Sequence, residues 1–133
     1  MIRRVLFVDD EPQVLAGLRK AMRSFRHRWA AQFANSAEEA LRMLSAGPLE
    51  VVISDARMPG VDGLQATRMI RKLEAAQGAP SHIPIIAMTA NNDESDKEDC
   101  REAGMDGFIT KPIEIKTIAG TIREIIESAR RSR

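Results

Sequence analysis

Two hydrophobic periods alternate along the chain. Short, almost wholly apolar runs predict strands over residues 2–8, 29–34, 49–54, 83–88 and 108–110. Between them, apolar residues recur at helical spacing and predict helices over 14–25, 36–44, 64–76, 94–103 and 115–126. Uniformly apolar strands are typical of a parallel sheet that is buried on both faces. Strict alternation of strand and helix therefore predicts an α/β fold with helices covering both faces of one sheet.

Two of the predicted helices carry further signals. Ser36 and Glu39 form a capping-box pattern that opens the second helix, and Gly47-Pro48 ends it. The fourth helix is rich in acidic residues and has only Cys100 and Ala103 as apolar anchors. A helix with so few buried contacts is a low-stability element that a modest free-energy change could move.

Length and composition limit the number of domains, the kinds of partner and the cellular location that we expect. The 133 residues suit a single domain, predicted over 1–128, with 129–133 as a basic tail or the start of a linker. A net charge of +1 gives no indication of direct binding to nucleic acid or a membrane. The single cysteine, Cys100, cannot form an internal disulfide, and we find no signal-peptide core or membrane-length apolar stretch. We therefore expect a cytoplasmic protein.

Polar residues follow four of the predicted strands. They are the run Asp9-Asp10-Glu11, then Asp55, then Thr89, and finally Lys111-Pro112. Carboxyl ends of parallel strands meet at one edge of a sheet, where α/β proteins bind ligands, so these groups should converge. Crowded carboxylates raise each other's pKa unless a cation lies among them, and oxygen ligands suit Mg²⁺. A lysine and a hydroxyl beside that ion suit a phosphoryl group.

Each of these positions taken alone has a simpler explanation. Asp10 could cap the first helix and Asp55 could begin a turn. Thr89 could cap the fourth helix, and Lys111-Pro112 could be a surface loop. The convergence of all four positions is what favours a site.

Four segments also resemble one family. Residues 5–12 (VLFVDDEP), 55–63 (DARMPGVDG), 88–90 (MTA) and 107–112 (GFITKP) are similar, in order and spacing, to the motifs of response-regulator receiver domains. The resemblance covers roughly residues 3–126. It implies a flavodoxin-like, doubly wound, five-stranded parallel sheet of strand order 2-1-3-4-5 with five helices.

The resemblance implies a phosphoacceptor signalling domain rather than an enzyme. Asp55 would take a phosphoryl group from the phosphohistidine of a sensor histidine kinase or a phosphotransfer protein. Mg²⁺ would be held by Asp10, the Asp55 carboxylate and the main-chain carbonyl of Arg57, with Asp9 reaching it directly or through water. Lys111 would pair with Asp55 at rest and with a phosphoryl oxygen afterwards.

Switching is expected to run through Thr89 and Phe108. In the family the hydroxyl turns to bond the phosphoryl group, and the aromatic side chain rotates into the vacated space. The surface of the fourth helix, fifth strand and fifth helix would then present the signal to an output domain or partner. A phosphorylation-dependent dimer is one form that this partner could take. The simpler interpretation of Phe108 is an ordinary core aromatic.

Three further expectations concern the surroundings of the phosphoryl group. Arg57 and Asn91 stand two residues after Asp55 and Thr89, where relatives tune the removal of the phosphoryl group by water. A solvent-facing arginine is the alternative for Arg57. The peptide bond between Lys111 and Pro112 is expected to be cis and to aim the lysine.

Two other classes of protein compete with this interpretation. A phosphohydrolase of the haloacid-dehalogenase type also uses an aspartate nucleophile, but it needs a second Asp where this chain has Arg57. A receiver-fold interaction module that works without phosphate usually lacks an acidic pocket residue or the lysine, and this chain has them all. Neither a G-x-G-x-x-G turn nor a P-loop is present to bind a nucleotide.

Overall fold

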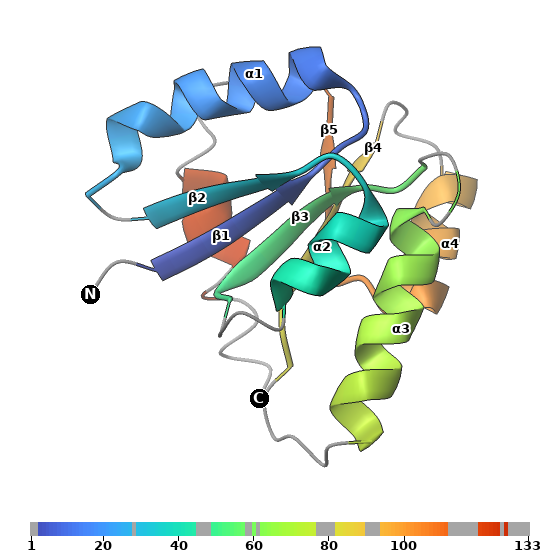
Figure 1. Cartoon of the computed structure of the whole chain (residues 1–133). Helices are drawn as coiled ribbons and strands as arrows, with labels where there is room; N and C mark the ends of the chain where they lie inside the picture. The colour runs from blue at the N-terminus through green and yellow to red at the C-terminus, as the bar shows by residue number, and fades with distance from the viewer. Residues whose placement is uncertain are drawn as a thin grey trace.

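The computed structural model of the chain describes residues 3–27, 29–44, 49–57, 60, 62–76, 82–89, 94–111, 120–125 and 127. Its strands are β1 (Arg3–Val8), β2 (Trp29–Ala34), β3 (Val51–Asp55), β4 (Ile85–Thr89) and β5 (Gly107–Thr110). They form one parallel sheet in the order β2-β1-β3-β4-β5 (Figure 1). The predicted flavodoxin-like topology is confirmed.

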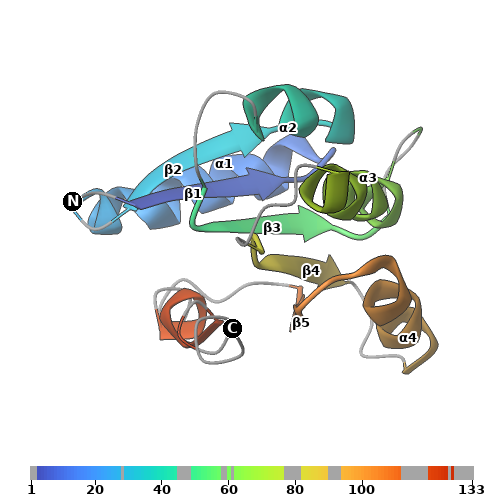
Figure 2. The same ribbon diagram turned by 90° about the horizontal axis from the view of Figure 1, so that it is seen from below.

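The helices alternate with the strands as predicted. They are α1 (Pro12–Met22, continued by a 3-10 turn over Arg23–Phe25), α2 (Ala37–Leu44), α3 (Gly63–Ala76) and α4 (Glu94–Ala103). Residues 120–125 are also helical and belong to the predicted last helix. Figures 1 and 2 both place α4 and this last helical segment on opposite sides of β5.

Two hydrophobic clusters fill the two sides of the sheet. On one side, Leu15 and Leu18 of α1 and Ile122 of the last helix pack against Phe7 and Ile53. On the other side, side chains of α2, α3 and α4 pack against alternate residues of the same strands, such as Leu6 and Val52 of β1 and β3. Successive side chains of a strand point to opposite faces, so uniformly apolar strands supply both clusters.

Strand boundaries differ from the prediction at β4, which begins at Ile85 rather than at residue 83. Ile83 donates its N–H to a carboxylate oxygen of Glu74 at 2.8 Å, and Pro84 has no N–H to donate. The paired register with β3 therefore begins at Ile85, although the Pro84 carbonyl already accepts the Val52 N–H at 2.9 Å. At the other end β4 extends to Thr89, and β3 likewise extends to Asp55.

The predicted cap of α2 and the two apolar anchors of α4 are confirmed, while Gly47 and Pro48 lie outside the described residues. Glu39 donates its N–H to Ser36 Oγ at 3.1 Å, and the Glu39 carboxylate accepts the N–H of Asn35 at 3.0 Å. The reciprocal bond thus reaches one residue further back than in the standard capping box. In α4, the buried residues are Cys100 and Ala103.

Candidate functional site

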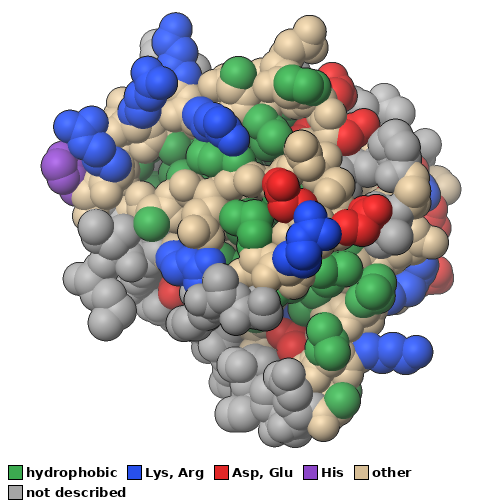
Figure 3. Space-filling model, viewed as in Figure 1, with side chains coloured by type: hydrophobic (Ala, Val, Ile, Leu, Met, Phe, Trp, Pro, Cys, Tyr) green, Lys and Arg blue, Asp and Glu red, His purple; other side chains and the backbone are tan. Residues whose placement is uncertain are grey.

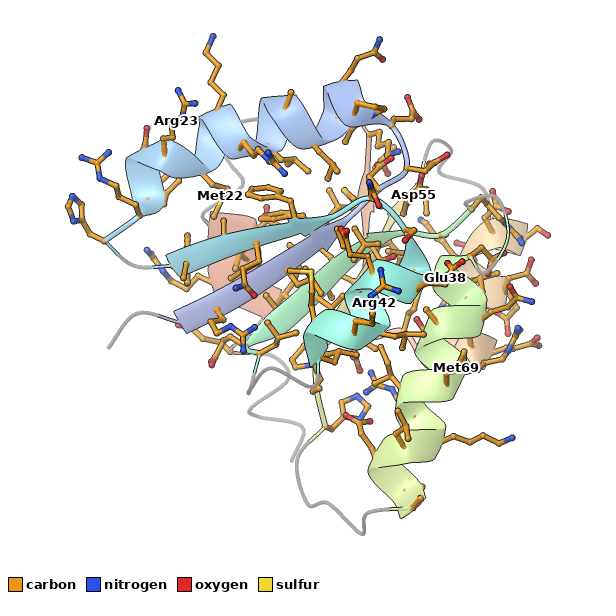
Figure 4. All side chains as sticks on the ribbon, in the orientation of Figure 1. Met22, Arg23, Glu38, Arg42, Asp55 and Met69 are labelled. Carbon is orange, nitrogen blue, oxygen red and sulfur yellow. The ribbon has the colours of Figure 1, made fainter. Side chains whose placement is uncertain are left out.

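The candidate site lies where β1 and β3 end side by side. The chain leaves β1 for α1, which packs on one face of the sheet, and leaves β3 for α3, which packs on the other. Divergence of the two connections at neighbouring strands opens a crevice beyond their carboxyl ends, the usual ligand site of such sheets. Asp55 stands at this end of β3 (Figure 4).

Two aspartates meet in this crevice with little access to solvent. Asp9 is 0% exposed and Asp55 is 8% exposed. The carboxylate of Asp9 accepts the N–H of Glu11 at 2.9 Å, and that of Asp55 accepts the N–H of Arg57 at 3.3 Å. Each carboxylate is thus oriented by the loop that follows its own strand.

One lysine joins the two carboxylates. Lys111 Nζ lies 2.8 Å from Asp9 Oδ2 and 3.3 Å from Asp55 Oδ2, and 3.8 Å from a carboxylate oxygen of Glu11. The backbone helps to place it, because the Lys111 N–H donates to the Thr89 carbonyl at 2.7 Å. The Lys111 side chain is only 18% exposed, so the alternative of an unconstrained surface loop fails for this residue.

These contacts shift the pKa values of Asp55 and Lys111. Burial raises the pKa of Asp55, and the charge of Asp9 raises it further, while Lys111 and the Arg57 N–H act in the opposite direction. Burial lowers the pKa of Lys111, but its hydrogen bond to Asp9 and the charges of Asp55 and Asp9 outweigh this and raise it. The lysine therefore stays charged at neutral pH, while ionised Asp55 is only partly compensated.

The carboxylates that converge are Asp9, Glu11 and Asp55, whose ligand oxygens lie within 4.8 Å of one another. Glu11 stood in the acidic run after β1, but sequence analysis did not select it. Asp10, which it did select, is exposed, and its carboxylate is not in this group. Asp10 does not cap α1 either, since the N-cap residue is Glu11 and no side chain bonds the helix end there.

Three carboxylates beside a single lysine leave an excess of negative charge. Oxygen donors of this kind are the ligands that Mg²⁺ prefers, so the residues present fit the ion that the sequence suggested. The predicted role of the Arg57 main-chain carbonyl as a metal ligand stays a prediction.

Thr89 is the last residue of β4, at the same edge of the sheet as Asp55. Its Oγ1 is buried and has no hydrogen-bond partner among the described residues. A buried hydroxyl left without a partner costs free energy, which is typical of a group that serves a ligand. Thr89 does not cap the fourth helix, which begins five residues later at Glu94.

Phe108 is half-buried in β5 and packs against the cluster on the α2–α4 side. The Arg101 guanidinium of α4 lies 5.3 Å from the centre of its ring, a cation–π distance. The aromatic side chain is therefore in contact with the helix whose movement the sequence suggested. Asn91 and Pro112 lie outside the described residues.

Arg57 turns its side chain away from the crevice. Its guanidinium lies 3.0 Å from Asp99 Oδ2 and 3.7 Å from Asp96 Oδ1, both on α4. The side chain is 58% exposed, as the solvent-facing alternative expected, but its guanidinium pairs with acidic side chains of α4. No pattern in the sequence indicated this partner.

The topology and the acidic edge define an α/β domain with a flavodoxin-like sheet and an acidic crevice at its switch point. The chain belongs to the response regulator receiver domain family, which it matches over residues 5–123. This family receives the signal in two-component phosphorelays. None of the described helices is long and apolar enough to cross a membrane.

The curated relatives include large sensor kinases. The chain is 33% identical over 129 residues to sensor histidine kinase RcsC of Escherichia coli K12, an alignment that covers 97% of this chain and 13% of RcsC. It is 35% identical over 127 residues to virulence sensor protein BvgS of Bordetella pertussis, covering 95% of this chain and 10% of BvgS. The chain thus spans a small part of these relatives.

Two solved structures have the same fold at moderate identity. The receiver domain of sensor histidine kinase PA1611 from Pseudomonas aeruginosa, solved with magnesium in its active-site cleft, gives a TM-score of 0.80 at 28% identity, covering 96% of this chain and 99% of that one. The Saccharomyces cerevisiae Ssk1 receiver domain, co-crystallised with the phosphotransfer protein Ypd1, gives 0.86 at 26% identity, covering 96% and 92%.

Proposed function

We propose that this domain takes a phosphoryl group from a phosphohistidine onto Asp55 and that this modification switches the surface formed by α4, β5 and the last helix. The observation that carries the proposal is the crevice itself. A buried carboxylate at the end of β3 lies 3.3 Å from the Lys111 ammonium and beside a second buried carboxylate, Asp9. The buried hydroxyl of Thr89, which has no hydrogen-bond partner in the described part of the chain, completes the set.

The transfer is a displacement at phosphorus. An oxygen of the Asp55 carboxylate forms a new O–P bond while the N–P bond of the phosphohistidine breaks, and the imidazole leaves with the bonding electron pair. Asp55 must be ionised to attack, and its raised pKa marks a carboxylate that is only partly compensated at rest. Lys111, already beside Asp55, neutralises an oxygen of the transferred group.

Mg²⁺ would be held here by Asp9, Glu11 and Asp55, joined by Asp10 and the Arg57 carbonyl as the sequence predicted. When bound, the ion offsets the negative charge that otherwise keeps a carboxylate and a phosphoryl group apart. The magnesium in the crevice of the PA1611 receiver supports this assignment.

The switch would use Thr89 and Phe108. The free Oγ1 of Thr89 donates a hydrogen bond to a phosphoryl oxygen, and Phe108 follows into the space that the threonine leaves. The Arg101 guanidinium of α4 lies over the Phe108 ring, so movement of the ring changes a contact that α4 makes. The output is a partner or domain that binds this altered surface.

The donor would be a sensor histidine kinase or a phosphotransfer protein. The co-crystal of Ypd1 with the Ssk1 receiver supports a partner of the second kind. Arg19, Lys20 and Arg23 make α1 basic, and Figure 3 shows Lys and Arg side chains gathered over this helix. We infer that a cytoplasmic donor docks on α1 of the receiver domain (residues 1–128) and that acidic side chains at the rim of the donor's site contact this basic helix.

The test is incubation with acetyl phosphate and Mg²⁺, followed by intact mass measurement. We expect one added phosphoryl mass that disappears on chelation of the metal and is absent from Asp55→Asn. A folded wild-type protein that gains no mass, and shows no change at Thr89 or Phe108 on addition of beryllofluoride, would contradict the proposal. It would favour an interaction module that works without phosphate.

A further inference from the structure

A single residue connects the phosphoacceptor loop to α4. The main chain of Arg57 contacts Asp55, to which it donates its N–H at 3.3 Å. The side chain of the same residue contacts α4 through Asp99 at 3.0 Å and Asp96 at 3.7 Å. The two ends of Arg57 therefore join the modified residue and the helix that is expected to move.

The helix that Arg57 holds is weakly attached elsewhere. Its buried residues are Cys100 and Ala103, and five of its other eight residues are acidic. An element with few buried contacts has a small free energy of local opening, so a contact of modest strength changes its population of open states measurably.

We propose that Arg57 clasps α4 in the resting protein through Asp99 and Asp96, and that phosphorylation of Asp55 draws its guanidinium away from them and frees the helix. The release rests on the proposed function, whereas the resting clasp does not. Arg57 is then a positioning residue that couples the site to α4.

Competition between Asp99 and a phosphoryl group for the Arg57 guanidinium favours release of α4. The side chains of Arg57 and Asp99 are 58% and 46% exposed, and exposed ion pairs are weak because water and salt screen them. A phosphoryl group brings a charge of nearly two and three acceptor oxygens, which suit a bidentate contact with a guanidinium. It arrives on the residue that the Arg57 main chain already touches.

Hydrogen exchange of the α4 amides measures both halves of the proposal. In the resting protein, Arg57→Gln and Asp99→Asn should each speed exchange over residues 94–103 by up to about fivefold, the range for an exposed ion pair. The double variant should exchange no faster than Arg57→Gln alone, because that substitution already removes the contacts to both Asp99 and Asp96. In wild type, beryllofluoride with Mg²⁺ should give a similar increase, and Arg57→Gln should show little further change.

Two matched controls separate the clasp from a general effect of charge. Glu102→Gln removes an acidic charge from α4, and Arg68→Gln removes a basic charge from an exposed position of α3. Neither should change exchange in α4 at rest. Unchanged exchange in resting Arg57→Gln, or the same increase in either control, would overturn the proposal.

Failure of the proposed function would look different. Acetyl phosphate labelling of the same samples reports phosphoryl transfer directly. A labelled wild type whose α4 exchange does not rise would overturn the release and leave phosphorylation intact. An unlabelled wild type alongside a fast-exchanging Arg57→Gln would overturn the phosphoacceptor role and support the resting clasp.

Discussion

At the scale of single residues, the chemistry of the crevice depends on how one ammonium group is shared. Lys111 lies against Asp9 and Asp55 at once, and both carboxylates are largely removed from water. Neither acid has a second cationic side chain recorded beside it in the part of the chain that the structure describes. The lysine therefore stabilises the resting fold, in addition to its proposed contact with the transferred group.

Replacing Lys111 by Met should lower stability at neutral pH. Removing one member of a buried pair leaves a charge uncompensated, and we expect a loss of about 1–3 kcal/mol, less than for a fully buried pair because the lysine is partly exposed. Urea unfolding monitored by the fluorescence of Trp29 measures this. The loss should shrink in acid, where the carboxylates become protonated; a loss that is the same at all pH values would contradict the charge argument.

Asp55→Asn should have the opposite effect. Because burial raises the pKa of Asp55, the native state binds this proton more tightly than the unfolded chain, and stability falls as pH rises and the group ionises. The neutral amide avoids that loss, so we expect a gain of about 1 kcal/mol at pH 7. Thermal unfolding of both proteins should converge at a pH below the ordinary pKa of aspartate. A variant that is less stable than wild type at pH 7 would show that Lys111 outweighs burial.

The residues of the crevice were predictable to different degrees. Asp9, Asp55, Thr89 and Lys111 follow apolar runs, and parallel strands bring their carboxyl ends to one edge whatever the details of packing. The approach of Glu11 and the partner of Arg57 depend on loop conformation and side-chain torsions. Strand and helix periods carry no information about either.

At the scale of elements, the position of Asp55 depends on how closely α3 approaches the end of β3. A Cβ atom added to Gly63, the first residue of α3, would collide with the Asp55 carbonyl oxygen and lie 3.0 Å from Ser54 Oγ. The obstacle is mainly main chain and cannot move aside like the end of a long side chain. The glycine therefore lets α3 start directly against Asp55, the proposed phosphoacceptor.

Gly63→Ala should consequently destabilise the domain by about 2 kcal/mol, in the range of overpacked sites, and should slow phosphorylation of Asp55. Gly17→Ala is the matched control, since Gly17 lies within α1 and an added Cβ meets nothing within 4 Å. Alanine there should be neutral or stabilising by up to about 1 kcal/mol. Denaturant unfolding and acetyl phosphate labelling measure the two effects. Equal unfolding free energies and labelling rates for the two variants would contradict a role of Gly63 in positioning Asp55.

The N-terminus of α2 allows a separate test of the predicted capping box. Ser36 Oγ accepts the Glu39 N–H, so Ser36→Ala should cost about 1 kcal/mol of unfolding free energy without changing the rate of phosphorylation. Chemical unfolding together with the labelling rate measures both quantities. A lower labelling rate would mean that α2 contributes to the crevice beyond its cap.

Element types could be predicted from the sequence, and several boundaries could not. The period of apolar residues placed α4 over 94–103, as the structure has it. The predicted start of β4 was wrong by two residues because Ile83 gives its N–H to Glu74, a side chain on the preceding helix α3. Boundaries of this kind are set by tertiary contacts, which a local pattern does not contain.

At the scale of the whole molecule, the two hydrophobic clusters fix the sheet as a rigid frame, and the groups that change lie at its edge. Alternate residues of β1 and β3 anchor both faces, so the carboxyl ends of these strands hold Asp9 and Asp55 in a constant relation. The more weakly anchored α4 lies beside that frame. Such a division suits a domain that changes a surface while keeping its fold.

The most direct test of the central claim is to identify the atom that carries the phosphoryl group. After incubation with acetyl phosphate and Mg²⁺, borohydride reduction converts an aspartyl phosphate to homoserine, and peptide mass mapping locates it. We expect homoserine at Asp55 and at no other aspartate, with none formed when Mg²⁺ is chelated. Homoserine at Asp9 or Asp10, or a phosphoryl mass that resists reduction, would contradict the assignment of Asp55 as the phosphoacceptor.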